Sequence, residues 1–345
     1  VSFINDKHII RTIQRIVQPL GRTIDTANPM VDARLRDGSR LNAIIPPLAL
    51  RGPVLTIRKF NKKLEDIDDL LRRGTLTVNM ARFLEASVLA KLNIVISGGT
   101  GSGKTTLLMA IMKFLYPTIT MRVQETAFEL HLRKIYPRNN ILSLRETDTI
   151  TGQMGLDVQK KTDGGVNILG EVATDPVAAW MIQMAQVASK FTLFTHHAKT
   201  FPNLITALRN SLLKIGMFNN EDVAEVQVVN VINFDVHLKR GVDGTRYIER
   251  ITECIPKEKE FKYHEGYKTA KNMEGKWEAF MDNATEYFRH MTQTSNYDYH
   301  NIVEFKDGEY VFVHQLSEAN VQAMRENMSD EDIKAFDKFL DTAWG

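Results

Sequence analysis

One stretch of the chain has the residue types and spacing needed to hold phosphate. Residues 98–105 read GGTGSGKT and fit the pattern G-x-x-x-x-G-K-[ST]. Glycines let backbone N–H groups turn toward phosphate oxygens, a lysine reaches the β- and γ-phosphates, and a threonine hydroxyl can ligate Mg²⁺. We therefore predict a site for ATP and Mg²⁺. Its binding residues are Gly99, Thr100, Gly101, Ser102, Gly103, Lys104, Thr105 and Thr106.

The residues on either side of this phosphate loop (residues 98–105) supply the elements that must position it. Ile94, Val95 and Ile96 precede the loop and are typical of a buried parallel strand. Apolar residues at helical spacing follow it, up to Pro117. The alternative is a glycine-rich turn that matches the pattern by chance, and the flanking strand and helix argue against it.

A second strand ends in an acidic residue. Residues 166–169 are apolar, and Gly170 and Glu171 follow them. A carboxylate at the end of a strand beside the phosphate loop can act as a general base toward the attacking water, or order that water through Mg²⁺. We predict that Glu171 does this and that Thr105 and Glu171 hold the Mg²⁺, with water between the metal and Glu171. The alternative is a surface acid at a strand end.

Length and pattern predict more than one domain, because 345 residues exceed the usual size of a single core. Residues 1–20 carry an apolar helical stripe, and short alternating runs at 31–35, 40–45 and 54–58 predict strands. Strand–helix alternation after residue 74 predicts a parallel α/β sheet. We predict a small α+β domain (1–60), a linker or hinge (61–73), an α/β ATPase domain (74–255) and a mixed, mostly helical C-terminal region (256–345) of unknown role.

Two further patterns concern the second half of the chain. Residues 226–238 and 246–254 predict the two strands of a hairpin around a turn at 242–244. Aromatic side chains between Trp277 and Phe288 recur at helical spacing, which favours core or inter-subunit packing over a ligand site.

Composition excludes several classes of protein. A formal net charge of +2 argues against general nucleic-acid binding, and the single Cys254 excludes an internal disulfide. No apolar run approaches the roughly 18 residues that a membrane span needs. The N-terminal residues do not resemble a signal peptide. We therefore expect a cytoplasmic protein with no bound metal besides Mg²⁺.

Two longer segments carry a resemblance to a known family. VDARLRDGSRLNAIIPPLALRGPVLTIRKF (31–60) and HLKRGVDGTRYIERITE (237–253) resemble the CpaF-like secretion ATPases, the motors of Tad pili, whose relatives act in type IV secretion and conjugation. The resemblance covers residues 1–255. It implies a RecA-like P-loop ATPase that forms a homo-hexamer. It also implies binding to an inner-membrane platform protein, and so a peripheral position at the inner membrane through partners.

The resemblance also implies further site residues. Residues 122–130 are similar to the family's acidic box and make Glu125 and Glu129 candidates for holding Mg²⁺-bound water, although Gln124 stands where the family has glutamate. The alternative is a solvated loop. Residues 194–198 are similar to the family's histidine box. In that box His197 is the candidate sensor of the γ-phosphate, or else an ordinary histidine at a strand end.

Arginines on the predicted N-terminal strands complete the candidate site. The resemblance implies that Arg40 and Arg58 reach the nucleotide and stabilise charge on the transferred phosphoryl group, a task that suits guanidinium. Arg34 is a third candidate, and the alternative for all three is an exposed arginine on a strand. Two segments depart from the family pattern, KKTDGG at 160–165 and VAS at 187–189.

Together these patterns predict an ATP-hydrolysing motor that drives pilin assembly or substrate export. Two alternatives remain open. One is a DNA-translocating ATPase of a conjugation system, and the other is a nucleotide-dependent assembly module with weak hydrolysis.

Overall fold

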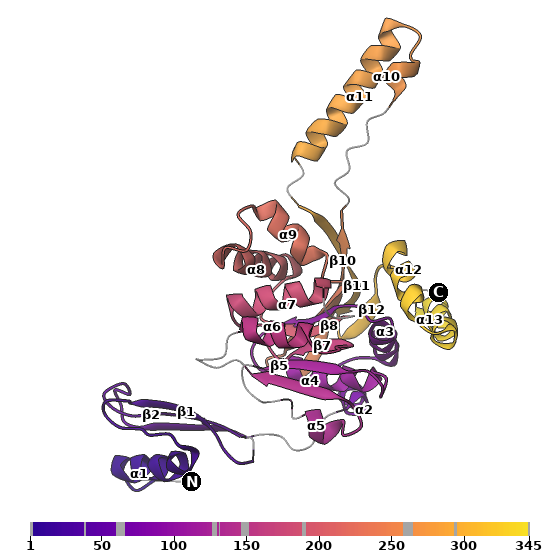
Figure 1. The fold of residues 1–345 in the computed structure, drawn as a ribbon. Helices are drawn as coiled ribbons and strands as arrows, with labels where there is room; N and C mark the ends of the chain where they lie inside the picture. The colour runs from indigo at the N-terminus through magenta and orange to yellow at the C-terminus, as the bar shows by residue number, and fades with distance from the viewer. Residues whose placement is uncertain are drawn as a thin grey trace. The chain divides into compact units, whose positions relative to one another are not determined.

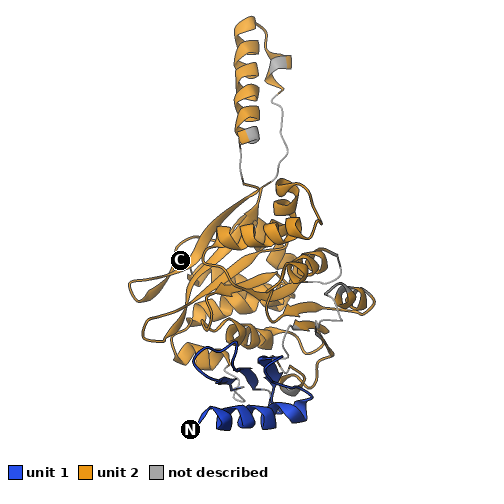
Figure 2. Cartoon of the chain, turned by 90° about the vertical axis from the view of Figure 1, so that its left-hand side faces the viewer, with its two compact units in different colours: residues 1–64, 127–129 blue, residues 65–126, 130–345 orange. Residues whose placement is uncertain are grey.

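The computed structural model describes residues 3–37, 39–59, 66–125, 130, 132–145, 152–187, 191–257, 265–292 and 295–343. Its described residues fall into two compact units (Figure 2). The first reaches residue 59, and the second contains the described residues from 66 onward.

The first unit is one helix with a small antiparallel sheet. Helix α1 (Asp6–Val17) is capped by Asn5, whose side chain accepts a hydrogen bond from the His8 backbone N–H. The short helix η1 (Gln18–Leu20) follows it. The sheet has the order β1 (Met30–Arg34), β2 (Arg40–Ile44), β3 (Val54–Arg58). The strand predictions for this part of the chain are confirmed. The small core contains Ile13, Val17, Ile24, Val31, Leu41, Ala43 and Ile45.

The second unit is built on a nine-stranded sheet (Figure 1). Six strands form its parallel part and lie in the order β9, β4, β8, β7, β5, β6. Strands β10, β11 and β12 add to the β9 edge as antiparallel neighbours. The strands are β4 (Ile94–Gly98), β5 (Met121–Glu125), β6 (Ile141–Arg145), β7 (Val166–Leu169), β8 (Thr192–His196), β9 (Phe234–Arg240), β10 (Arg246–Pro256), β11 (Tyr297–Lys306) and β12 (Glu309–Phe312).

Helices cover both faces of this sheet, which confirms the predicted α/β class. Ile94 and Ile96 of β4 belong to one core cluster and Val95 to the other, because successive side chains of a strand point to opposite faces. The first cluster includes α3 (Val78–Leu89), α4 (Lys104–Ile111), α12 (Glu318–Asn327) and α13 (Asp330–Ala343). The second includes α7 (Asp175–Val187), α8 (Phe201–Lys214) and α9 (Glu221–Val229).

The remaining helices are short or lie outside these layers. They are α2 (Ile67–Arg72), η2 (Met112–Phe114), α5 (Leu132–Ile135), α6 (Gly152–Lys160), α10 (Gly266–Thr269) and α11 (Met273–Thr292). Among the helices that the structure describes, none has both the length and the apolar character needed to cross a membrane. Strands β11 and β12 are joined by a turn at Asp307 and continue the same sheet.

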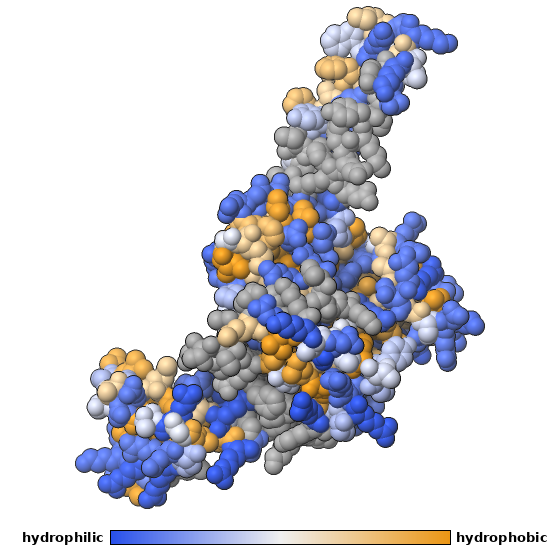
Figure 3. All heavy atoms as spheres, in the orientation of Figure 1, coloured by the Kyte–Doolittle hydropathy of each residue, from blue (hydrophilic) through white to orange (hydrophobic). Residues whose placement is uncertain are grey.

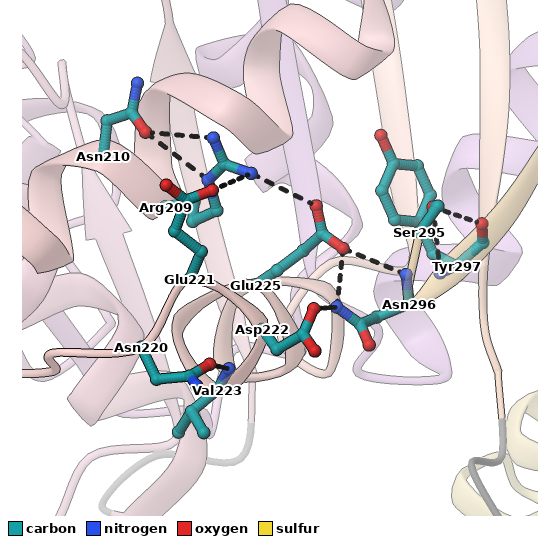
Figure 4. Close-up of polar contacts among 10 residues, drawn as sticks. All are labelled: Arg209, Asn210, Asn220, Glu221, Asp222, Val223, Glu225, Ser295, Asn296 and Tyr297. Carbon is teal, nitrogen blue, oxygen red and sulfur yellow. Dashed lines mark hydrogen bonds and ion pairs between the residues drawn. The ribbon is translucent and has the colours of Figure 1, made fainter. Parts of the chain in front are cut away.

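One strand prediction is wrong in its first part. Residues 226–229 belong to helix α9, and the strand begins only at Phe234. Asn220 caps this helix by accepting a hydrogen bond from the Val223 backbone N–H. Buried Glu225 then accepts hydrogen bonds from the backbone and side-chain N–H groups of Asn296, at 2.9 and 2.6 Å (Figure 4). The cap and these tertiary contacts override the β-branched run that favours a strand.

The aromatic residues predicted at helical spacing do lie on one helix, α11. However, Trp277 and Phe280 are each 58% exposed, so core packing is wrong for them, and the other alternative, inter-subunit packing, stays a prediction.

Candidate active site

The phosphate loop joins β4 to α4 as predicted, and its backbone shape depends on glycine. Gly98 and Gly103 have φ values of 139° and 101°, which side-chain-bearing residues rarely adopt. A Cβ atom on Gly98 would also collide with the Leu238 carbonyl oxygen of β9. Ser102 is buried and its hydroxyl donates to the Gly99 carbonyl at 2.9 Å, whereas Gly99, Thr100 and Gly101 are exposed. The contacts of Gly98 and Ser102 thus fix the backbone of the loop, and the three exposed residues leave its other side open to solvent.

Lys104 lies across this loop at the start of α4. Its side chain is largely buried, and the Nζ atom donates to the carbonyl oxygens of Gly98 and Gly99 at 3.0 and 2.9 Å. The same atom lies 3.4 Å from Nδ1 of His197. The lysine is therefore held by its own loop on one side and by the end of β8 on the other.

Glu171 and His197 meet at the carboxyl ends of adjacent strands. Glu171 follows β7, His197 follows β8, and their Oε1 and Nε2 atoms are 2.9 Å apart. A neutral imidazole with its proton on Nε2 satisfies both neighbours, because it donates to Glu171 and accepts from Lys104. Both side chains are more than 40% exposed, so a ligand in the loop can reach them. The structure thus brings three of the predicted residues into one line of contacts.

Two neighbours hold this line in place from the strand ends. The Thr195 hydroxyl donates to the Gly170 carbonyl at 2.7 Å, and the Val172 backbone N–H donates to the Thr195 carbonyl at 2.9 Å. His196 bonds the Val172 carbonyl through Nδ1 at 2.8 Å, and burial lowers its pKa, so it is neutral at physiological pH. These contacts fix the backbone on both sides of Glu171. Thr195, the threonine of the histidine box, therefore positions the acid.

Four residues were predicted to hold Mg²⁺ or its bound water, and the structure describes the side chains of two of them, Thr105 and Glu171. Thr105 and Thr106 are half-buried at the start of α4. Glu125 ends β5, but its side chain lies outside what the structure describes, and so does Glu129. Among the described residues, no group of three or more His, Cys, Asp or Glu side chains could hold a metal ion. Mg²⁺ keeps several of its waters and needs few protein ligands, so the hydroxyl of Thr105 and a water-mediated Glu171 fit it.

The three candidate arginines lie in the first unit, and the strand register places them side by side. Arg34 of β1 lies opposite Arg40 of β2, and Arg40 lies opposite Arg58 of β3. Residues directly opposite across antiparallel strands share a face, so like charges meet there. Arg40 also pairs with Asp32 at 2.8 Å. We call these three residues the arginine row.

A family model described as "Type II/IV secretion system protein" matches residues 1–246 of the chain. The chain belongs to this family. The match covers both the arginine row and the phosphate loop, and it ends at the start of β10. The narrower likeness to the CpaF-like motors stays a prediction.

Individual proteins and a solved structure are also similar to this chain. An uncharacterized Methanocaldococcus jannaschii protein is 41% identical over 122 residues, which is 34% of this chain and 17% of that protein's own length. The conjugal transfer protein TrbB of Rhizobium radiobacter is 26% identical over 69% of this chain and 72% of its own length. The X-ray structure of the Legionella pneumophila ATPase DotB superposes with a TM-score of 0.51 at 15% identity, covering 98% of this chain and 85% of that one. This last likeness shows the fold alone.

The sequence did not predict that the β9–β10 hairpin contacts the phosphate loop. Arg246 donates through Nε to the Gly101 carbonyl at 2.9 Å and so contacts the phosphate loop directly. It also lines a cavity of about 280 Å³ beside the loop, together with Arg73, Thr75 and Thr106. The only signal in the sequence is a charged residue after the turn at 242–244, and this gives no indication of chemistry.

A second arginine of β10 ties the hairpin to the histidine box. Arg250 donates through Nη2 to the Lys199 carbonyl, two residues after His197, at 3.0 Å. Its Nη1 pairs with Glu249 at 2.7 Å, and Glu249 also pairs with Lys239 at 2.7 Å. Through these contacts strand β10 holds the segment that follows His197.

Buried polar groups lie beside the strand that leads into the loop. Ser97, the residue before Gly98, contacts Nδ1 of His237 at 2.8 Å. Burial lowers the pKa of His237 to about 4 and raises the pKa of its neighbour Asp235 to about 6. At neutral pH His237 is therefore uncharged and Asp235 is mostly ionised.

Proposed function

We propose that this chain is an ATP-hydrolysing motor of a secretion or pilus-assembly system. The observation that carries the proposal is the line of contacts from Lys104 through His197 to Glu171 across the carboxyl ends of β4, β8 and β7. In parallel α/β sheets ligands bind at this edge. Family membership supports the same conclusion.

In this proposal the phosphate loop holds the β- and γ-phosphates of ATP. Lys104 exchanges its contacts with the loop carbonyls and with His197 for contacts with phosphate oxygens. His197 is then free to bond the γ-phosphate and so to report whether it is present. Glu171 takes the proton from the attacking water. Mg²⁺, when bound, neutralises charge on the β- and γ-phosphates, and Thr105 and water on Glu171 would hold it, with Glu125 and Glu129 as further candidates.

The arginine row supplies the second set of positive charges. Arg40 pairs with Asp32, and the register places guanidinium groups from three adjacent strands side by side, where their N–H donors suit an anionic phosphoryl group. We propose that Arg40 and Arg58 stabilise charge on the transferred phosphoryl group, with Arg34 as a third candidate. In this view residues 1–60 act as a clamp for the nucleotide, residues 61–73 act as the hinge, and residues 74–255 form the motor domain.

The wider assembly follows from the same proposal. A homo-hexamer would couple hydrolysis to rotation of the first unit against the second. This motion would act on an inner-membrane platform protein, so the motor would work in the cytoplasm at the membrane surface.

Steady-state ATP hydrolysis by the wild type and by Glu171→Gln tests the proposal. We expect kcat to fall by about 10²-fold or more while nucleotide binding is kept, because the amide cannot accept a proton. Glu221→Gln, an exposed acid in the first turn of α9, is the control and should hydrolyse ATP like the wild type. If wild type is no faster than Glu171→Gln, the weakly hydrolysing assembly module replaces the motor.

A second candidate function is DNA translocation in conjugation, favoured by the likeness to the conjugal transfer protein TrbB. Hydrolysis that is stimulated by single- or double-stranded DNA, with salt-sensitive DNA binding, would support it. The formal net charge of +2 argues for the opposite result.

A further inference from the structure

Helices α10 and α11 form a hairpin in the part of the chain beyond the family match. Small residues line the side of α11 that α10 approaches. A Cβ atom placed on Gly266 of α10 would lie 3.5 Å from the Cβ atom of Ala279, and one placed on Gly275 would lie 3.3 Å from that of Ala270. Ala279 is only 9% exposed. This side of α11 therefore already has its partner.

The other side of α11 carries a stripe of large apolar side chains. At 100° per residue these side chains cluster on the side of the helix away from Ala279. The apolar stripe consists of Met273, Trp277, Phe280, Met281, Tyr287 and Phe288, which are between 44% and 70% exposed. Apolar side chains gather along one side of the hairpin in Figure 3. The rings of Trp277 and Phe280 meet edge to face at 5.7 Å, so neighbouring members of the stripe pack on each other.

The size of this stripe indicates an interface. Large aromatic side chains bury roughly 150–250 Å² each, so six about half-exposed side chains present roughly 700 Å² of apolar surface. A contiguous patch above a few hundred Å² marks an interaction site on a protein surface. Two such stripes in contact would bury about 1,400 Å² in total, within the range of stable protein–protein interfaces.

Charge on the rest of the helix decides between the occupants. Acidic residues recur every four positions at Glu274, Glu278, Asp282 and Glu286. An anionic lipid surface would repel this row, whereas membrane-surface helices carry Lys and Arg on their polar face. Arg289, near the other end of the helix, pairs with Glu286 of the same helix.

We propose that α11 is a self-association surface, and that its apolar stripe packs against the same stripe of a second copy of this chain. The two helices, each of 20 residues and so about 30 Å long, would form an antiparallel pair. This contact requires neither nucleotide nor the arginine row. Its failure and the failure of the proposed motor activity are therefore separable.

Disulfide trapping in the full chain tests this pairing. Ala284 lies on the side of the helix that carries the stripe and close to the middle of α11, whereas Asp282 lies on the polar side of the same helix. The native Cys254 is 1% exposed and burial raises its pKa, so it stays a protonated, unreactive thiol. We expect Ala284→Cys to give a cross-linked dimer under mild oxidation and Asp282→Cys to give none above collision level. Adding Trp277→Glu to Ala284→Cys should abolish the cross-link, with helicity checked by circular dichroism.

Three outcomes would overturn the proposal. Equal cross-linking of Ala284→Cys and Asp282→Cys would mean random collisions, and no cross-linking of either would mean that another molecule covers the stripe. Wild-type binding to vesicles of anionic phospholipid that Trp277→Glu abolishes would assign the stripe to a membrane. Val242→Glu, an equally drastic change at a fully exposed turn, is the control and should leave the cross-link of Ala284→Cys intact.

Discussion

The two halves of the proposed site, one in each unit, are built in different ways. The phosphate loop lies at the centre of a nine-stranded sheet, and its lysine, histidine and glutamate already contact one another. The arginine row lies on a three-stranded sheet with a core of seven buried apolar side chains, and its charges lie side by side. The first half is preassembled in that its charged side chains contact one another, whereas the second places three cations side by side, of which Arg40 pairs with Asp32. The predictions below test the proposal that the arginine row acts on a nucleotide held by the phosphate loop.

Lys104→Ala should have the largest effect, because it removes the cation at the centre of the preassembled half. We expect hydrolysis to fall by about 10³-fold and ATP affinity to fall with it. Steady-state hydrolysis and binding of a fluorescent nucleotide measure the two effects. Lys113→Ala, which removes an exposed lysine that pairs with Asp66, is the control. A Lys104→Ala variant with normal turnover would mean that the preassembled half is not the catalytic one.

The buried groups beside β4 should make stability depend on pH in two opposing ways. Asp235 has a folded pKa of about 6, above its usual 3.8, so the ionised folded state is penalised and its contribution to stability falls between about pH 4 and 6. His237 has a folded pKa of about 4, below its usual 6.5, so its contribution rises between about pH 4 and 6.5. Each group changes the free energy of unfolding by about 3 kcal/mol over its pH range. In the wild type the two changes have opposite signs and largely cancel.

Single substitutions should uncover each contribution in urea unfolding. Relative to wild type, Asp235→Asn should gain stability as the pH rises from about 4 to 6.5, and His237→Gln should lose it. Arg40→Gln on the exposed sheet should follow the wild-type curve. Parallel curves for all three variants would mean that the support beneath the phosphate loop does not titrate as the structure indicates.

Substitutions in the arginine row test the other half of the comparison. We expect Arg40→Gln and Arg58→Gln each to lower kcat by about 10²-fold with little change in nucleotide affinity, because the row acts on charge that develops in the transition state. The exposed Arg22→Gln in the same unit is the control. If both variants lose affinity instead and keep kcat, the row binds the ground state and does not assist the reaction.

The smallest effect should come from the tie between β10 and the histidine box. Arg250→Gln removes the hydrogen bond to the Lys199 carbonyl, and we expect kcat to fall about tenfold while KM for ATP changes little, because Arg250 acts on the position of His197 and has no phosphate contact of its own in the proposed site. Arg250→Lys should restore part of the activity if the tie positions His197. An equal loss of thermal stability and activity in both variants would indicate a structural role only.

Much of the preassembled half could be predicted from the sequence because its demands are local. Glycines at 98 and 103, a preceding apolar strand and a following helix are contiguous in the chain, and each follows from backbone geometry. The arginine row was predicted residue by residue from resemblance. Its alignment across three strands depends on their register, which no single residue specifies.

Only the tertiary structure could assign Arg246 and Arg250 to the site. The order of the sheet places β9 next to β4 and β10 next to β9, so residues nearly 150 positions after the phosphate loop lie against it. Helix α9 shows the same limit, because a β-branched run that favours a strand is helical in the structure, where Asn220 caps the helix and Asn296 bonds Glu225. The sequence by itself therefore determined the chemistry of the loop. The neighbours that hold the loop depend on strand order and packing between distant segments, which only the fold decides.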